Sequence, residues 1–386
     1  MIQESNRLSS LSEYYFSGKL EQVRQMNEKG LNVINLGIGS PDLAPSESTI
    51  AAAVKALQSE KNHGYPSYRG TPQLRKAFAD WYKKTYDVEL KHDKNILPLL
   101  GSKEGLFYLA MAFVNPGEKV LVPNPGYPAY TSVCRLAGAQ EVYYNLSADK
   151  KWRPDFGALE KSDLSGVKLM FANYPHMPTG QPASEDLLKK LVEFGKKHGI
   201  LVIHDNPYSQ VLNTTVPLSI LKFDPELKYT MELNSMSKAF NMAGWRVGVL
   251  SGHQQYIESV LKVKSNVDSG QFLPLQFGAI EALKNPPEWH AKRNDIYKKR
   301  RELVFEIFDV LKFEAARDQV GLFVWAKAPD SIKSVETFVD NILEKANVFL
   351  TPGFIFGSQG ERYARSSLCV EESLLKEALK RIKGVL

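Results

Sequence analysis

Short apolar runs alternate with helix-like segments over residues 46–250 of the chain. The runs have the length and composition of strands, and they lie at 95–97, 119–122, 142–144, 169–172, 200–203 and 247–250. Helical patterns occupy the segments between them. This alternation predicts an α/β domain whose mostly parallel sheet is flanked by helices.

The two ends of the chain have a different pattern. Residues 10–29 have the pattern of an amphipathic helix that ends at Gly30, and a strand is predicted at 33–36. Later helices are predicted near 253–265, 271–284, 290–312 and 371–384, and later strands near 320–327, 347–351 and 362–369. We therefore expect a smaller α+β domain built from the N-terminal arm and the C-terminal part. The expected domains are 1–45 (arm and small-domain segment), 46–280 (large domain) and 281–386 (small C-terminal domain).

Composition narrows the class of protein. Among the 386 residues, 43% are hydrophobic and 24% are charged, as in ordinary soluble globular proteins. The net charge of +6 comes without a basic run interleaved with aromatic residues, so we expect no nucleic-acid partner. The sequence has no membrane-length apolar stretch and no signal-peptide pattern, and its two cysteines lie far apart. These features predict a cytoplasmic protein without a membrane partner. The seven histidines lack metal-ligand spacing, so we expect no metal.

A lysine follows the apolar run at 229–233. Two hydroxyl residues, Ser235 and Ser237, precede Lys238, and Arg246 follows eight positions later. A lysine amine can form a Schiff base with an aldehyde, of which pyridoxal phosphate is the commonest. The hydroxyls and the guanidinium suit the phosphate of such a molecule. A solvated surface lysine is the simpler interpretation of this residue alone.

Other strand ends carry residues that suit the same ligand. Asp205 ends the 200–203 run and can pair with a pyridinium nitrogen, and Tyr208 can donate to a ring oxygen. Gly101 and Ser102 open a helix, where free backbone N–H groups can hold a phosphate. Tyr127 can stack on a flat heterocycle. Capping, a structural turn or simple packing would explain each residue equally well on its own.

Two further segments could border the same edge of the sheet. The loop 173–180 begins with Asn173 and contains glycine and prolines that hold it in a fixed conformation. Arg365 lies in an apolar, β-prone segment of the small domain. Such an arginine either has a structural partner or binds a carboxylate from a ligand.

Together these segments resemble the class I/II aminotransferases, which are fold-type I enzymes dependent on pyridoxal phosphate. The resemblance implies a seven-stranded sheet, and it matches Lys238 to the Schiff-base lysine, Asp205 to the pyridinium partner and Tyr208 to the ring-oxygen donor. It implies further cofactor contacts for Ser102, Lys103, Tyr127, Asn173, Met177, Ser235, Ser237 and Arg246, and for Tyr65 across a dimer interface. Gly39, Met177 and Arg365 are implied to contact the substrate, with Arg365 binding its α-carboxylate.

The resemblance also implies an activity. We expect transamination between an amino acid and a 2-oxo acid by a ping-pong mechanism through a Lys238 internal aldimine. The freed amine of Lys238 would move the proton as base and acid, while Asp205 keeps the ring an electron sink. The expected partners are these small molecules and a second copy of the chain, in a homodimer with shared active sites.

Met177 is a departure from the family. Its members usually have asparagine before Pro-Thr-Gly, and the asparagine amide contacts the ring oxygen and the substrate carboxylate. A thioether cannot donate such a hydrogen bond. The neighbouring His176 should point the other way in an extended loop. We therefore expect an altered grip on the substrate or a shifted aldimine pKa, and not an inactive enzyme.

The substrate and the reaction type stay open at this point. A β-lyase or a decarboxylase could use the same residues, and an effector-sensing regulator could use the same fold. The segment 264–272 resembles diaminopimelate-type aminotransferases and could place Asn266 or Ser269 in the site of either subunit. The aromatic residues Tyr14, Tyr15 and Phe16 could instead favour an apolar substrate, or simply pack in the core.

Overall fold

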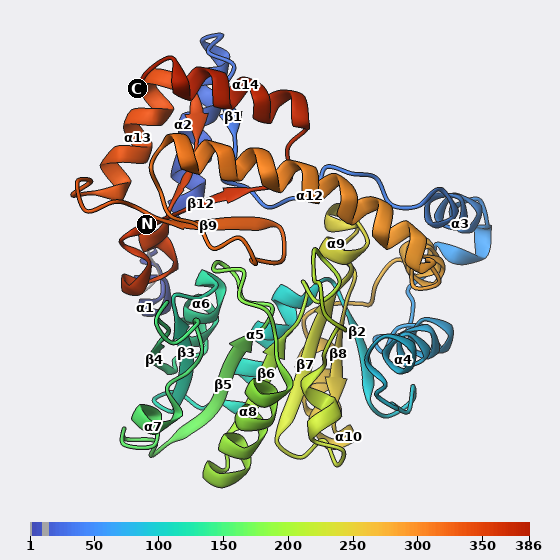
Figure 1. The fold of residues 1–386 in the computed structure, drawn as a ribbon. Coiled ribbons are helices and arrows are strands. Elements are labelled where there is room, and N and C mark those ends of the chain that lie inside the picture. The colour runs from blue at the N-terminus through green and yellow to red at the C-terminus, as the bar shows by residue number, and fades with distance from the viewer. Residues whose placement is uncertain (1, 10–14) are drawn as a thin grey trace.

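The computed structural model describes residues 2–9 and 15–386, and its elements fall into two stacked parts (Figure 1). The lower part contains a seven-stranded sheet in the order β2-β8-β7-β6-β5-β3-β4. Its strands are β2 (Ile96–Leu99), β3 (Lys119–Asn124), β4 (Gln140–Asn145), β5 (Val167–Asn173), β6 (Leu201–Asp205), β7 (Thr230–Ser235) and β8 (Gly248–Gly252). Neighbours from β7 to β4 are parallel, whereas β8 is antiparallel to both β7 and β2. The predicted α/β fold with a mostly parallel sheet is confirmed.

Helices cover both faces of this sheet because its strands are apolar on both sides. Val120 and Val122 of β3 pack with α5 (Ser102–Phe113), α6 (Pro128–Leu136) and α10 (Gln254–Lys264). Leu121, between them, faces the opposite layer with α4 (Pro72–Tyr86) and α8 (Glu185–His198). This two-residue alternation is what a parallel sheet buried on both faces requires. Also in this part are α3 (Glu47–Leu57), α7 (Phe156–Leu159), α9 (Met236–Ala239) and α11 (Leu273–Ala282), and the 3-10 helices Glu60–Asn62, Ile220–Phe223 and Ala243–Trp245.

The upper part in Figure 1 combines both ends of the chain. β1 (Ile34–Asn35) pairs parallel with β10 (Val348–Phe349), and β12 (Tyr363–Ser367) lies between β11 (Thr351–Pro352) and β9 (Phe323–Lys327) in an antiparallel sheet. The helices are α2 (Tyr15–Glu28), α12 (Pro287–Val310), α13 (Val335–Ala346) and α14 (Glu372–Lys383), with 3-10 helices at Gly353–Phe356 and Ser358–Gly360. The domain boundaries at 45 and 280 stay a proposal.

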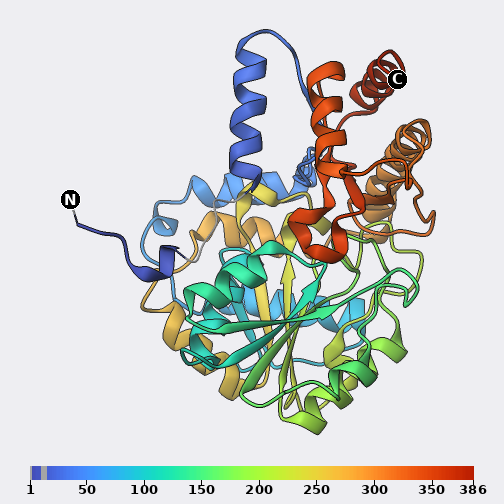
Figure 2. The same cartoon turned by 90° about the vertical axis from the view of Figure 1, so that its left-hand side faces the viewer.

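Both ends of the chain lie away from the large sheet. Figure 2 shows α1 (Asn6–Ser9) beside the lower part, whereas the C-terminus lies in the upper part. The structure leaves residues 10–14 undescribed, so the first turn of the predicted helix at 10–29, including Tyr14, lies outside the described residues. In the described part of the chain, no helix combines the length and the apolar character needed to cross a bilayer.

The sequence patterns missed the helix α13 (Val335–Ala346). Its signals are nevertheless ordinary ones: the Ser334 hydroxyl accepts from the backbone N–H of Thr337, and Asn347 ends the helix in the left-handed conformation. The buried residues Val335, Val339 and Ile342 recur at helical spacing and pack in the core of the small domain. The helix could therefore have been predicted from its caps and periodicity.

Candidate active site

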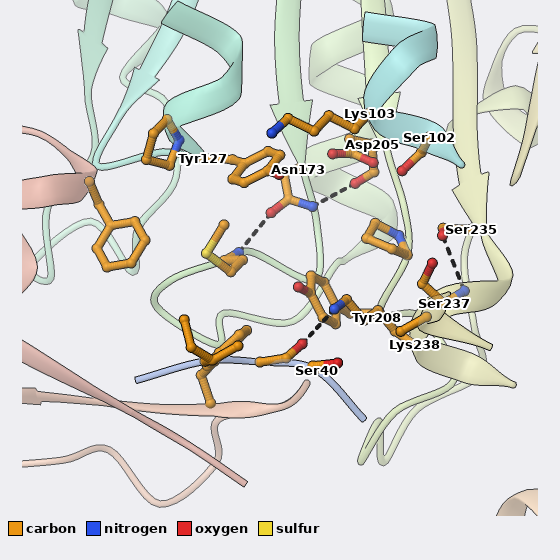
Figure 3. Close-up of a pocket in the computed structure, with 18 of the residues that line it drawn as sticks. Ser40, Ser102, Lys103, Tyr127, Asn173, Asp205, Tyr208, Ser235, Ser237 and Lys238 are labelled. Atoms are coloured by element: carbon orange, nitrogen blue, oxygen red, sulfur yellow. Dashed lines mark hydrogen bonds between the residues drawn. The ribbon is translucent and has the colours of Figure 1, made fainter. Parts of the chain in front are cut away.

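A cavity of about 390 Å³ lies between the carboxyl ends of the parallel strands and the small domain. Strands β5, β6 and β7 end there at Asn173, Asp205 and Ser235. Figure 3 shows these side chains around one space, together with Lys238 and Tyr208. The structure brings the following predicted residues together in its wall: Gly39, Ser102, Lys103, Tyr127, Asn173, Met177, Asp205, Tyr208, Ser235, Ser237, Lys238, Arg246 and Arg365.

Lys238 reaches the cavity from α9, the short helix that follows β7. The Ser235 hydroxyl caps this helix by accepting the backbone N–H of Ser237 at 3.2 Å. The Lys238 ammonium donates to the carbonyl oxygen of Gly39 at 2.5 Å. Burial lowers the pKa of Lys238, and the positive charges of Arg365 and Arg246 act in the same direction. A lower pKa makes the neutral, nucleophilic amine easier to form.

Asp205, at the end of β6, lies in the cavity wall. Its Oδ2 accepts the Tyr130 hydroxyl at 2.9 Å, whereas its buried Oδ1 has no hydrogen-bond partner among the described residues. Burial raises the pKa of Asp205 to about 6, the Tyr130 hydroxyl opposes this shift, and the charges of the buried pair His204 and Glu232 act in opposite directions. A protonated ring nitrogen would satisfy Oδ1 and would favour the ionised carboxylate.

The start of α5 lies against Arg246 at the other end of the cavity. Gly101, with φ +89°, precedes the helix, and a Cβ at this position would lie 2.1 Å from Nη2 of Arg246. Nη1 of Arg246 donates to the Ser237 hydroxyl at 3.3 Å. The start of helix α5, hydroxyls and a guanidinium thus converge where a phosphate could bind.

Arg365 lies on β12 between two phenylalanine rings. Its guanidinium carbon is 3.9 Å from the ring centroid of Phe323 and 4.6 Å from that of Phe356. Nη2 donates to the carbonyl oxygen of Gly37 at 2.8 Å, and Nη1 contacts Sδ of Met177 at 3.3 Å. The rings hold the guanidinium plane in one orientation, which suits a bidentate carboxylate contact.

The loop after β5 is tied to β6 through Asn173. The Asn173 amide donates to the carbonyl oxygen of Asp205 at 2.6 Å, and its Oδ1 accepts the backbone N–H of Met177 at 2.7 Å. His176 points away from the cavity, as expected, with Nδ1 2.8 Å from the Thr179 hydroxyl. Burial lowers the pKa of His176 to about 3, so its side chain is neutral near pH 7.

Sequence reasoning missed several wall residues. Tyr130 follows Tyr127 by three positions on the first turn of α6, which was a signal that both could face the same side. Leu20, Ile38, Phe323 and Phe356 also line the cavity. Only the tertiary structure places these four beside the strand ends, because they come from the N-terminal arm and the small domain.

Some predicted or suggested residues lie outside the cavity wall. Tyr65 is 91% exposed, which leaves it available to a second copy of the chain. Asn266 and Ser269 are exposed and do not reach the cavity of their own chain. The Tyr15 ring packs edge-on against Phe354, 5.3 Å between centroids. Placement in this chain's own site is therefore wrong for Asn266 and Ser269.

Comparison with known proteins decides the family. The family model described as aminotransferase class I and II matches residues 32–382. The chain belongs to this aminotransferase family. An LL-diaminopimelate aminotransferase from Halothermothrix orenii is 38% identical to this aminotransferase over 384 residues, covering 99% of this chain and 98% of that protein.

Solved structures of similar proteins agree with this assignment. The substrate-bound BacF structure from Bacillus subtilis is 34% identical, covers 100% of this chain and 98% of that one, and has a TM-score of 0.95. A single mutant of Thermus thermophilus aspartate aminotransferase is 25% identical with full coverage of both chains and a TM-score of 0.93. This enzyme is therefore an aminotransferase dependent on pyridoxal phosphate. The unsatisfied Oδ1 of Asp205 and the close approach of Gly101 to Arg246 fit that cofactor.

Proposed function

We propose that this aminotransferase exchanges an amino group between an amino acid and a 2-oxo acid in two half-reactions, with ping-pong kinetics. When bound, pyridoxal phosphate supplies the aldehyde that carries the amino group and the ring that withdraws electrons from Cα. The observation that carries this proposal is the arrangement of Lys238, Asp205 and Arg365 around one cavity. The related protein's name makes LL-diaminopimelate one donor to test.

The residues of the cavity wall would have different roles according to their positions. Ser102, Ser235 and Arg246 would hold the phosphate, with Ser237 and Lys103 beside them. Asp205 would accept the ring N–H through Oδ1, Tyr208 would donate to the ring oxygen, and Tyr127 would stack on the ring. The contacts of Asn173 keep Asp205 and Met177 in place.

Lys238 would have two roles. Its neutral amine would form the Schiff-base link expected from the sequence, and after displacement it would move the proton to and from Cα of the substrate. Its lowered pKa favours the neutral amine in both roles. Arg365 would hold the substrate α-carboxylate, and the small domain would thereby orient Cα toward Lys238.

We also propose a homodimer with shared sites. Tyr65 and Val267 are exposed at 91% and 61%, although both are large apolar residues. Such exposure is typical of residues that a partner surface covers. The cytoplasmic location expected from the sequence stays a prediction.

Reduction with borohydride tests the role of Lys238. In the loaded enzyme, reduction should fix the cofactor to the peptide that contains Lys238, and mass spectrometry should find it there. Lys238→Ala should lose this label and at least about 10³-fold of the transamination rate. Lys103→Ala, a second lysine of the same wall, should keep the label. A label on another lysine would overturn the proposal.

A further inference from the structure

The cavity has a polar end and an apolar end. Ser102, Ser235 and Arg246 lie in the wall at the start of α5 and α9. The arm and the small domain contribute the large apolar residues Leu20, Ile38 and Phe356, with the small hydroxyls of Ser17 and Ser40 beside them. On the basis of the proposed transamination, we propose that the amino donor has an uncharged, apolar side chain of aromatic size, and that this side chain binds between Arg365 and Leu20. The proposal names a substrate class that differs from diaminopimelate and from acidic amino acids.

Most charged residues of the wall have other roles. Among the described wall residues they are Lys103, Asp205, Lys238, Arg246 and Arg365. Arg246 belongs to the phosphate end, and Asp205 and Lys238 lie at the proposed positions of the ring and the aldehyde. Lys103 follows Ser102 at the start of α5, and its side chain extends toward Tyr127 (Figure 3). Arg365 is the proposed partner of the α-carboxylate that every amino acid carries. Apart from Arg365, the described wall residues from the arm and the small domain carry no charge. A second carboxylate, or the distal ammonium and carboxylate of diaminopimelate, would therefore lack a charged partner in that part of the wall.

The surroundings of Arg365 determine where the side chain goes. Only Cα separates the α-carboxylate from the side chain, so the side chain begins within a few ångströms of the guanidinium. On both sides of that guanidinium lie aromatic rings, Phe323 and Phe356. Met177 adds a thioether at 3.3 Å from Nη1, where the family has an amide. These groups offer dispersion and apolar area, and they offer no strong hydrogen bond to a polar side chain.

In a homodimer, segment 264–270 of the second copy would offer no unpaired charge to a donor side chain. Lys264 and Asp268 form an ion pair at 2.7 Å, and their side chains are only 3% and 10% exposed. Asp268 also accepts the backbone N–H of Gly270 at 2.8 Å and the Tyr108 hydroxyl at 3.2 Å. Both charges are therefore satisfied within their own chain. Val267 is an exposed large hydrophobic residue of this segment, and its exposed neighbours Asn266 and Ser269 are uncharged.

A donor panel tests the proposal. In single-turnover experiments with loaded enzyme, the change in cofactor absorbance is followed with L-phenylalanine, L-glutamate, L-aspartate and LL-diaminopimelate. The second-order rate constant for L-phenylalanine should exceed that for each charged donor by at least about 10-fold. A charged donor that reacts as fast or faster would overturn the substrate class but would leave transamination standing.

Ligand binding separates the two proposals if no donor reacts. In that case transamination itself is overturned, and calorimetry with unreactive carboxylates decides the side-chain class. 3-Phenylpropanoate should bind the loaded enzyme at least about 10-fold more tightly than glutarate. Equal or tighter binding of glutarate would overturn the inference.

A substitution that introduces a positive charge tests where the side chain of the amino donor binds. Leu20→Arg places a cation in the apolar end and should raise the ratio of the L-glutamate to the L-phenylalanine rate constant by at least about 10-fold. Leu31→Arg is the matched control, because Leu31 is 41% exposed, against 39% for Leu20, but lies outside the cavity wall. The control should leave the ratio unchanged. A ratio that Leu20→Arg does not move would overturn the proposed location.

Discussion

The hydroxyl of Tyr130 donates a hydrogen bond to Oδ2 of Asp205 at 2.9 Å, and both side chains are buried. The Tyr130 ring is stacked on Phe171, with centroids 5.0 Å apart and an angle of 13° between the planes. The contact therefore fixes one carboxylate oxygen, whereas the other has no hydrogen-bond partner among the described residues. Tyr130 is a positioning residue in this arrangement, since it acts through Asp205.

Removal of the Tyr130 hydroxyl should weaken the interaction of Asp205 with the ring N–H of the cofactor without unfolding the protein. Tyr130→Phe should slow the first half-reaction by about 5- to 100-fold, which corresponds to a lost hydrogen bond of about 1–3 kcal/mol. It should also shift the pH dependence of that rate, because the hydroxyl lowers the pKa of Asp205. Tyr144→Phe is the control: it removes a buried hydroxyl that donates to the carbonyl oxygen of Phe171. Equal effects of both variants would contradict the positioning role.

The stability of the cofactor-free protein should depend on Asp205 between about pH 4 and pH 6. The folded-state pKa of about 6 lies above the ordinary value of 3.8, so the folded state binds the proton more tightly. The resulting stabilisation is complete below pH 4 and is lost as pH rises through 6, a change of about 3 kcal/mol. Urea unfolding should show this loss relative to Asp205→Asn, in which the group does not titrate. Parallel pH profiles of the two proteins would contradict it.

A methyl group at Gly101 should interfere with binding of the phosphate. Its Cβ would lie 2.1 Å from Nη2 of Arg246, so the guanidinium must move. We expect Gly101→Ala to weaken pyridoxal phosphate binding by at least about 10-fold, as measured by fluorescence titration of the cofactor-free protein. Gly117→Ala has nearly the same backbone strain, with φ +85° instead of +89°, and no atom near its Cβ. That control should lose about 1 kcal/mol of stability and keep its cofactor affinity.

Restoring the family residue at position 177 should strengthen the binding of carboxylate ligands. In Met177→Asn an amide replaces the thioether that contacts Nη1 of Arg365. One added hydrogen bond to a carboxylate corresponds to about 1–3 kcal/mol, so 3-phenylpropanoate should bind about 5- to 100-fold more tightly by calorimetry. The pH titration of the bound cofactor's absorbance should shift as well. If neither quantity changes, Met177 does not explain the altered grip expected from the sequence.

Hybrid dimers should show whether Tyr65 acts in the site of its neighbour. A hybrid of a Lys238→Ala chain with a Tyr65→Ala chain would then contain one site with both residues intact. Tagged hybrids, purified by two affinity steps, should have about half of the wild-type rate. If Tyr65 acted within its own chain, both sites would be defective, and the hybrid would be no more active than its parents.

Much of the fold follows from local patterns. Apolar runs of strand length and helical spacing depend on near neighbours in the sequence, so they predict the α/β part well. The short strands at Val348–Phe349 and Thr351–Pro352 were merged into one, because two-residue strands have almost no period of their own. Their separation depends on two different pairing partners, β1 and β12.

The candidate site, like the fold, could be predicted only in part from the sequence. The sequence alone pointed to Lys238, Asp205 and Arg365, because each is a chemically unusual residue within or shortly after an apolar run. Only the tertiary structure showed that Tyr130 engages one oxygen of Asp205, that Met177 contacts Arg365, and that Leu20 and Phe356 border the cavity. These contacts join segments far apart in the chain, and no local pattern encodes which distant side chains will meet. The sequence therefore determined the chemistry of this aminotransferase, and the packing of arm and small domain onto the sheet decided what surrounds it.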